Sequence, residues 1–286
     1  MKNILVTGAN GQLGNEMRVL SEENKEYNYY FTDVAELDIS NEQAVMAFVK
    51  DNDINVIVNC AAYTAVDKAE DNLGICTILN SDAVGYLAKA AAANDAEFIQ
   101  ISTDYVFDGT NHLPYKETDP TCPNSVYGVT KLKGEENAMN DCKKTMVIRT
   151  AWLYSTFGNN FVKTMIRLGK EREALGVVFD QIGTPTYARD LARAIFAAIN
   201  KGVMPGVYHF SNEGVCSWYD FTKAIHRIAG ITTCKVSPLH TDEYPAKAPR
   251  PNYSVLDKTK IKTTYGIEIP HWEESLAACI AALEDK

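Results

Sequence analysis

The chain has 286 residues, of which 46% are hydrophobic, so it can form one large domain or two smaller ones around an apolar core. Its formal net charge is −9 and it contains no run of basic residues. This argues against a nucleic-acid partner, because phosphate binding needs a dense basic surface. The seven cysteines form no CxxC pair, so they indicate neither a disulfide framework nor a zinc cluster and fit buried thiols in a reducing cytosol.

The apolar run at the start of the chain ends at Gly8, far below the length of a signal peptide's apolar region or a membrane span. We therefore expect a cytoplasmic protein without a membrane segment. Short β-branched runs occupy residues 4–7, 29–32, 56–59, 98–102 and 146–150. Segments with apolar residues at helical spacing lie between them. This alternation predicts an α/β fold with a Rossmann-like, doubly wound parallel sheet.

The pattern changes near residue 150, where shorter helical segments and proline-bearing connections begin. We therefore expect a dinucleotide-binding domain over residues 1–150 and a smaller α/β substrate-binding lobe over residues 151–286. A helical segment near residues 186–200 is expected to pack back on the first domain.

Three glycines, Gly8, Gly11 and Gly14, follow the first predicted strand with GxxGxxG spacing. The first two allow a tight turn and a close approach of backbone to a pyrophosphate, and the third allows close packing of helix on strand. An ordinary strand-to-helix turn would also tolerate this spacing. The strand before the motif and the alternating pattern after it favour dinucleotide binding.

Asp33 ends the second predicted strand, where a carboxylate can bind the ribose hydroxyls of the cofactor. No arginine follows closely, which favours NADH over NADPH, although Asp33 can equally be a turn residue. Asp38 and Ile39 are candidates for an adenine pocket, but Asp38 can also simply precede a helix that starts near Ser40. Small residues after the third strand, including Ala61, either let a flat cofactor lie against the backbone or allow tight helix–sheet packing.

Thr103 closes the fourth predicted strand, at the edge where open α/β sheets bind ligands. Tyr127 and Lys131 follow on one face of a helix, four residues apart. A phenol, with a pKa of about 10, needs a nearby cation to transfer protons at neutral pH. Such a pair can also be a solvated helix pair. The order of the glycine motif, Thr103 and the Tyr–Lys pair favours a catalytic site.

These motifs resemble the extended short-chain dehydrogenase/reductases, and more specifically the family of dTDP-4-dehydrorhamnose reductases. The segments that carry the closer resemblance are AAYTAVDKAE (61–70), STDYVFDG (102–109), VYGVTKLKGE (126–135), RTAWLY (149–154), GNNFVKTM (158–165), DQIGTPT (180–186) and RPNYSVLD (250–257). They span nearly the whole chain.

The resemblance implies an NAD(P)H-dependent oxidoreductase that reduces the 4-keto group of dTDP-4-dehydro-6-deoxy-L-mannose to dTDP-L-rhamnose, the activated sugar of cell-surface polysaccharides. Tyr127 would donate the proton, Lys131 would lower its pKa, and Thr103 would orient the keto oxygen. The positions implied for the cofactor, together with the glycine motif, are Gly8, Gly11, Gln12, Leu13, Gly14, Asp33, Asp38, Ile39, Ala61, Ala62, Tyr63, Thr64, Tyr127 and Lys131. Those implied for the substrate are Val66, Thr103, Asp104, Tyr105, Trp152 and Arg250.

Several points stay open at this level. Trp152 can be a core aromatic, although its indole face suits the apolar methyl group of a 6-deoxysugar. Arg167 and Arg172 are further candidates for the diphosphate beside Arg250. Some relatives hold Mg²⁺ at a homodimer interface with acidic side chains. Glu16 matches one of these, but Arg189 stands where an acid would be needed, so both the metal and the homodimer are left open.

Other functions share parts of this pattern. A nucleotide-sugar 4,6-dehydratase needs a glutamate where Tyr105 stands, so the sequence disfavours it. Nucleotide-sugar epimerases share the Thr–Tyr–Lys set but keep their NAD bound. A non-catalytic regulatory subunit, of the beta type found with methionine adenosyltransferase, is the alternative outside catalysis.

Overall fold

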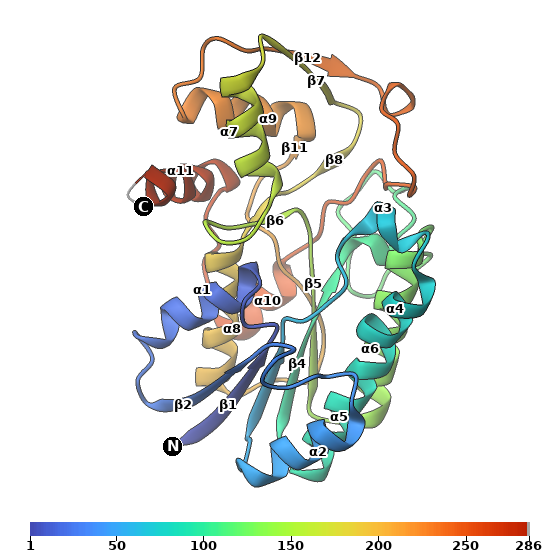
Figure 1. Cartoon of the computed structure of the whole chain (residues 1–286), viewed down its shortest axis with the longest axis vertical. Coiled ribbons are helices and arrows are strands. Elements are labelled where there is room, and N and C mark those ends of the chain that lie inside the picture. Colours follow the sequence, from blue (N-terminus) through green and yellow to red (C-terminus); the bar gives the residue numbers. More distant parts are fainter. Residues whose placement is uncertain (285–286) are drawn as a thin grey trace.

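The computed structural model describes residues 1–284 and is organised around a six-stranded parallel sheet with strand order β10-β5-β4-β3-β1-β2 (Figure 1). The strands are β1 (Lys2–Thr7), β2 (Tyr27–Thr32), β3 (Val56–Asn59), β4 (Glu97–Thr103), β5 (Thr145–Thr150) and β10 (Gly206–His209). From β1 the strands are added in two directions, β2 on one side and β3, β4, β5 and β10 on the other, as in a doubly wound sheet. The predicted Rossmann-like α/β fold is therefore confirmed. Strands β3 and β5 are buried along their whole length, because helices cover both faces.

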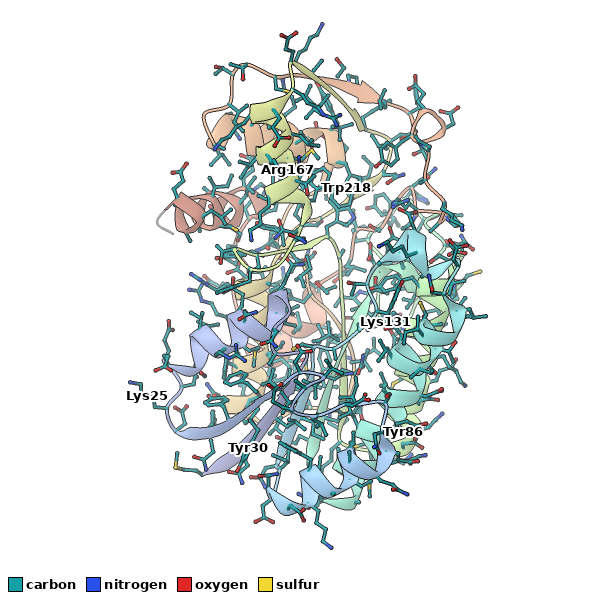
Figure 2. All side chains as sticks on the ribbon, in the orientation of Figure 1. Lys25, Tyr30, Tyr86, Lys131, Arg167 and Trp218 are labelled. Atoms are coloured by element: carbon teal, nitrogen blue, oxygen red, sulfur yellow. The ribbon has the colours of Figure 1, made fainter. Side chains whose placement is uncertain are left out.

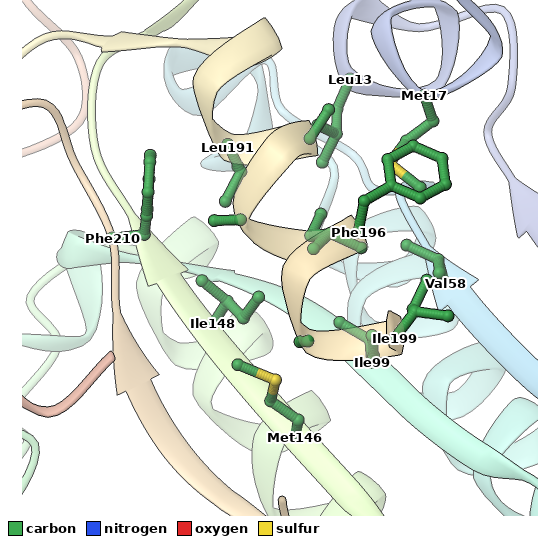
Figure 3. Packing of buried hydrophobic residues seen from close by; sticks show 14 of the residues in the cluster. Leu13, Met17, Val58, Ile99, Met146, Ile148, Leu191, Phe196, Ile199 and Phe210 are labelled. Atoms are coloured by element: carbon green, nitrogen blue, oxygen red, sulfur yellow. The ribbon is translucent and has the colours of Figure 1, made fainter. Parts of the chain in front are cut away.

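Two hydrophobic clusters lie on opposite faces of this sheet. On one face are α1 (Gln12–Ser21), α8 (Ala188–Lys201) and α10 (Thr259–Tyr265), and on the other are α2 (Glu42–Asp51), α5 (Ala83–Ala93) and α6 (Val126–Asp141). Figure 3 shows the first face, where Leu191, Phe196 and Ile199 of α8 lie between the α1 residues Leu13 and Met17 and the strands. Helix α8 therefore belongs to the core of the sheet although it comes late in the chain.

The sixth strand, β10, also comes from the later part of the chain and pairs in parallel with β5. This strand is not predictable from the sequence, because its four residues of mixed polarity carry no clear strand pattern. The division near residue 150 stays a prediction.

The other elements of the later half pack around a third cluster, which includes Phe221, Ile225, Trp272 and Leu276. Figure 1 shows them beyond the carboxyl ends of the sheet strands, at the top of the view. They are β6 (Leu153–Tyr154), α7 (Phe161–Glu171), β7 (Ala174–Val178), β8 (Ile182–Gly183), β9 (Thr186–Tyr187), β11 (Cys216–Ser217), α9 (Trp218–Ile228), β12 (Lys235–Leu239), a 3-10 turn (Thr241–Glu243) and α11 (Trp272–Glu284).

Short helical turns complete the connections of the sheet. They are α3 (Val66–Ala69), α4 (Leu73–Thr77), a π-helical turn (Ile78–Asp82) and a 3-10 turn (Asp104–Val106). Within residues 1–284, no helix combines the length and the apolar character that a membrane crossing requires.

Candidate active site

Two adjoining cavities lie at the carboxyl ends of the sheet strands. The first, which we call the glycine cavity, has a volume of about 300 Å³ and is lined by Gly8, Gly11, Asp33, Val34, Leu37, Asp38, Ile39, Cys60, Ala61, Ala62 and Leu79. The second, the tyrosine cavity, has a volume of about 550 Å³ and is lined by residues of β4, α6 and several later segments. Gly11, Cys60, Ala61 and Ala62 line both, so the two cavities are continuous.

The glycine cavity depends on backbone contacts that a side chain would block. Gly8 has a φ of +61°, and a Cβ atom there would lie 2.7 Å from the Cα atom of Ala61. A Cβ atom on Gly14 would lie 2.5 Å from the Cα atom of Ala9, so this glycine lets α1 pack on the loop. Helix α1 begins directly after Gly11, which lines the cavity, and no side chain caps its amino end, so its first backbone N–H groups are suited to an anion.

Both aspartates of the glycine cavity have structural partners. The Asp33 carboxylate accepts hydrogen bonds from the backbone N–H groups of Asn10 (3.1 Å) and Val34 (2.9 Å). Asp38 accepts from the backbone N–H (2.9 Å) and the hydroxyl (2.7 Å) of Ser40, and these bonds hold the pKa of Asp38 below its usual range. Each aspartate thus shapes its loop and also lines the cavity.

Two glycines set the position of helix α6, which carries Tyr127 and Lys131. Ser125 caps its amino end by accepting from the backbone N–H of Gly128 at 3.1 Å. A Cβ atom on Gly128 would lie 2.3 Å from the carbonyl oxygen of Tyr105. One on Gly134 would lie 2.1 Å from that of Asn80. The helix therefore lies in close contact with Tyr105, which follows β4, and with the π-helical turn that carries Asn80.

This packing brings Thr103, Tyr127 and Lys131 to one wall of the tyrosine cavity. Lys131 is only 3% exposed, and its ammonium donates to the carbonyl oxygen of Ile101 at 2.6 Å (Figure 2). Burial lowers the pKa of Lys131 to about 8, and the Glu135 carboxylate opposes this shift. Burial raises the pKa of Tyr127 to about 12, against the effect of a hydrogen bond with Thr103. The pair is therefore not the solvated helix pair that the sequence also allowed.

Asp104 and Tyr105 follow Thr103 into the same cavity. The Asp104 carboxyl accepts from the Thr103 hydroxyl at 3.0 Å, and burial raises its pKa to about 6. The ring of Tyr105 meets that of Tyr127 edge to face, with centroids 5.5 Å apart. The three consecutive residues and Tyr127 thus form one polar cluster at the end of β4.

Trp152 also lines the tyrosine cavity. It is one of three non-glycine residues with positive φ (+49°) among residues 1–284, and it stacks on Trp218 with ring centroids 3.6 Å apart. Trp218 was not among the residues predicted for the site. The spacing of Ser217 and Asp220, which form a capping box, could have placed Trp218 in the first turn of a helix. Nothing in the sequence joins it to Trp152, because they meet only through the tertiary fold.

Other predicted site residues are distributed unevenly. Gln12, Leu13, Thr64 and Val66 line the tyrosine cavity. Gly14 and Tyr63 do not line either cavity, and the backbone N–H of Tyr63 donates instead to the side chain of Asn80.

The arginines proposed for a diphosphate are not among the residues that line the two cavities. Arg250 forms an ion pair with Asp67, with an Nη2–Oδ2 distance of 2.7 Å and an Nη1–Oδ1 distance of 3.1 Å. Arg167 lies on α7 and pairs with Glu171 (Figure 2). Among the described residues, no arginine therefore lines the glycine cavity or the tyrosine cavity.

Glu16, the candidate metal ligand, is fully buried and already paired. Its carboxylate accepts from the Ser155 hydroxyl at 2.6 Å and from Nε of Arg189 at 2.9 Å. Within the described part of the chain, no group of three or more His, Cys, Asp or Glu side chains is arranged to hold a metal. Arg189 thus supplies the positive charge opposite this buried carboxylate.

The doubly wound sheet, the glycine loop at its edge and the clustered Thr103, Tyr127 and Lys131 define a dehydrogenase/reductase of the extended short-chain type. A family model described as "RmlD substrate binding domain" matches residues 1–285. The chain belongs to this family, whose curated relatives include many dTDP-4-dehydrorhamnose reductases, so the resemblance seen in the sequence is confirmed.

One such relative, the dTDP-4-dehydrorhamnose reductase of Aggregatibacter actinomycetemcomitans, is 41% identical over 286 residues, covering 96% of this chain and 97% of the relative. The crystal structure of a dTDP-4-dehydrorhamnose reductase from Clostridium acetobutylicum superposes with a TM-score of 0.95 at 46% identity, covering 99% of each chain. The enzyme from Bacillus anthracis, solved in complex with NADP, gives a TM-score of 0.94 at 40% identity, covering 99% of this chain and 100% of the other.

Proposed function

We propose that this chain catalyses the NAD(P)H-dependent reduction of the 4-keto group of dTDP-4-dehydro-6-deoxy-L-mannose to dTDP-L-rhamnose. The observation that carries the proposal is the placement of Thr103, Tyr127 and Lys131 on one wall of a cavity that is continuous with the glycine cavity. The names of its relatives support the same substrate and a nicotinamide cofactor.

The residues of the tyrosine cavity suggest how the proton is delivered. Because burial raises the pKa of Tyr127 to about 12, its hydroxyl is protonated at neutral pH and can act as a donor. We propose that it gives this proton to the substrate's O4 as negative charge develops there, while the Thr103 hydroxyl orients that oxygen. The charge of Lys131 would stabilise the phenolate that remains. A bound nicotinamide cofactor supplies the hydride.

The residues that line the glycine cavity support a dinucleotide as its ligand. The close approach of Gly8 to the Ala61 backbone leaves room for a pyrophosphate at the amino end of α1. Asp33 lines the glycine cavity, which supports a contact with ribose hydroxyls, and we infer a preference for NADH from it. The proposed cofactor contacts on the cavity walls are Gly8, Gly11, Gln12, Leu13, Asp33, Asp38, Ile39, Ala61, Ala62, Thr64, Tyr127 and Lys131. Gly14 and Tyr63 line neither cavity and would contribute only through the neighbouring residues.

The sugar would lie in the tyrosine cavity, among Val66, Asp104, Tyr105 and Trp152. The stacked indole of Trp152 offers an apolar surface for the C6 methyl group. Arg250 would reach the diphosphate only after leaving Asp67, so its contribution requires that the ion pair opens.

The direct test is oxidation of NADH, followed by absorbance, with enzymatically prepared dTDP-4-keto-L-sugar as substrate and NADPH in a parallel reaction. We expect consumption of reduced cofactor and formation of dTDP-L-rhamnose, identified by chromatography against a standard. Folded protein that consumes neither cofactor with verified substrate would contradict the proposal. In that case, tightly bound NAD would indicate an epimerase, and a co-purifying synthetase would indicate a regulatory subunit.

A further inference from the structure

Beneath the tyrosine cavity lies a buried charged network that no step of the proposed reaction uses. Glu135 is 1% exposed and accepts a hydrogen bond from the Ser102 hydroxyl at 2.5 Å. The same carboxylate accepts from Nε (2.9 Å) and Nη2 (2.7 Å) of Arg149. Ser102 and Arg149 are partners across strands β4 and β5. Glu135 thus ties helix α6 to two neighbouring strands at a single point.

The position of Glu135 relates this network to the proposed catalytic residues. It lies four residues after Lys131 on the same face of α6, and its partner Ser102 directly precedes Thr103. The hydrogen bond between Ser102 and Glu135 therefore connects the strand end that carries Thr103 to the helix that carries Tyr127 and Lys131.

Stability alone is a weak reason for such a network. A buried ion pair often contributes no more than apolar residues of the same volume, because desolvation offsets the attraction. Here the pair is also imperfect, since Nη1 of Arg149 is buried without a hydrogen-bond partner among residues 1–284. The ring of Phe107, 5.1 Å from the guanidinium, covers another side of Arg149.

The charges around Lys131 come from three directions. Glu135 on α6 is the largest influence that opposes its desolvation. Cys60 after β3 also faces the lysine, but burial raises the pKa of its thiol to about 12, so the thiol stays neutral. Tyr127 on α6 and Asp104 after β4 line the same cavity as the lysine.

Behind Glu135, Arg149 on β5 carries the compensating positive charge. His209 at the end of β10 stays neutral, because burial and Arg149 lower its pKa to about 3. Glu117, whose carboxylate accepts from the backbone N–H of His209, has a pKa raised by burial. Glu135 is thus the carboxylate that acts most strongly on the buried ammonium of Lys131.

We propose that Glu135 is a positioning residue, a buried counter-charge that keeps Lys131 protonated and holds α6 against the strand end that bears Thr103. This inference rests on the proposed function for its effect on turnover, but the charge of Lys131 can be measured without any substrate. Without Glu135, burial alone would act on the ammonium, which would then lose its proton at lower pH.

The test compares Glu135→Gln with Arg149→Lys. Glu135→Gln retains the shape of the side chain and removes its charge. Arg149→Lys disturbs the same network by removing the bidentate contact but leaves the Glu135 charge in place. Both variants should unfold at lower temperature than the wild type. Only Glu135→Gln should alter Lys131.

Two measurements distinguish an effect of the Glu135 charge on Lys131 from a general loss of stability. Lys131 is titrated by NMR of protein labelled with ¹³C at the lysine ε-carbons, and its resonance is assigned with Lys131→Arg. We expect Lys131 to lose its proton at lower pH in Glu135→Gln and at unchanged pH in Arg149→Lys. The decline of kcat at alkaline pH should also shift to lower pH in Glu135→Gln and stay unchanged in Arg149→Lys. Above pH 8, the turnover of Glu135→Gln should therefore be lower than that of the wild type by roughly tenfold.

If Glu135→Gln does not fold because Arg149 is left uncompensated, the double variant Glu135→Gln/Arg149→Met is compared with Arg149→Met, so that the two proteins differ only in the Glu135 charge. An unchanged Lys131 titration in a folded variant without the Glu135 charge would overturn the inference. If the wild type does not reduce the sugar but the titration of Lys131 still changes in Glu135→Gln, the proposed function is refuted. The role of Glu135 as a counter-charge to Lys131 then still holds.

Discussion

The two cavities are built in different ways. The glycine cavity is lined by loops that follow β1, β2 and β3, and its critical contacts are between backbone atoms, such as Gly8 against Ala61. The tyrosine cavity draws its walls from β4, α6 and segments as distant in the chain as Trp152 and Trp218. The first therefore depends on the absence of side chains, and the second on specific side chains placed and desolvated by the rest of the fold.

This difference teaches what kind of change each cavity tolerates. In the glycine cavity an added methyl group should interfere with ligand and stability together, because no side chain can move aside. In the tyrosine cavity a substitution can remove one chemical function and leave the other cavity intact. Measurements that separate cofactor binding from turnover can test this contrast.

The largest effect is expected for Tyr127→Phe. The change removes one hydroxyl from the wall of the tyrosine cavity, so turnover should fall by about 10²- to 10⁴-fold, as for a lost general acid. Cofactor affinity should change little, as measured by fluorescence titration with NADH and NADPH. Near-normal kcat in this variant would remove Tyr127 from the proton-donor role.

The next effect is expected for Gly8→Ala. Its φ of +61° and the 2.7 Å approach to the Ala61 backbone make a methyl group unfavourable, at a cost of about 1–3 kcal/mol in the free energy of unfolding. Thermal denaturation with and without cofactor should show both a lower Tm and a smaller stabilisation by the ligand.

The matched control for this glycine is Gly74→Ala in α4, where an added Cβ meets no atom within 4 Å. There alanine should stabilise by up to about 1 kcal/mol or have no effect, because it is a better helix former. Equal destabilisation at the two glycines would argue against a special role of the Gly8 turn.

A smaller effect is expected for Trp218→Ala. The change removes the ring stacked on Trp152, so the indole wall of the tyrosine cavity loses its support. The KM for the sugar should rise by roughly 3- to 10-fold, which corresponds to the energy of one aromatic pair. Cofactor affinity should be preserved, and Trp218→Phe should restore part of the loss. A change in cofactor affinity as large as the change in KM would contradict the view that the two cavities act independently.

The smallest effect is expected for Asp33→Ser. Loss of a carboxylate hydrogen bond to the ribose hydroxyls should lower kcat/KM with NADH by about fivefold. The value with NADPH should stay the same or rise, because repulsion of the additional phosphate is relieved. Equal losses with both cofactors would mean that Asp33 acts through its loop contacts with Asn10 and Val34.

Much of the first half of the fold could be predicted from the sequence. All five predicted strand segments lie within β1 to β5. They could be predicted because β-branched runs and glycine turns reflect local backbone preferences. Strand β10 could not be predicted, since its four residues become a strand only by pairing with β5. The π-helical turn before α5 likewise has no signal in the apolar spacing.

The candidate site likewise has some features that the sequence predicts and others that it does not. The order of the glycine motif, Thr103 and the Tyr–Lys pair is visible in the sequence, because steric freedom of glycine and the four-residue spacing of a helix are local properties. The partners of Arg250, Glu135 and Trp152 are not visible there. Each of these pairs joins residues that are distant in the chain or on different elements.

The sequence by itself thus determined the class of fold, the glycine turn and the identity of the residues available for proton transfer. The tertiary structure alone decided that Lys131 is buried beside Glu135, that Arg250 is paired with Asp67 and that Trp218 supports Trp152. The physical reason is that backbone preferences act over a few residues. Desolvation and charge pairing depend on atoms that come together only when the whole chain has folded.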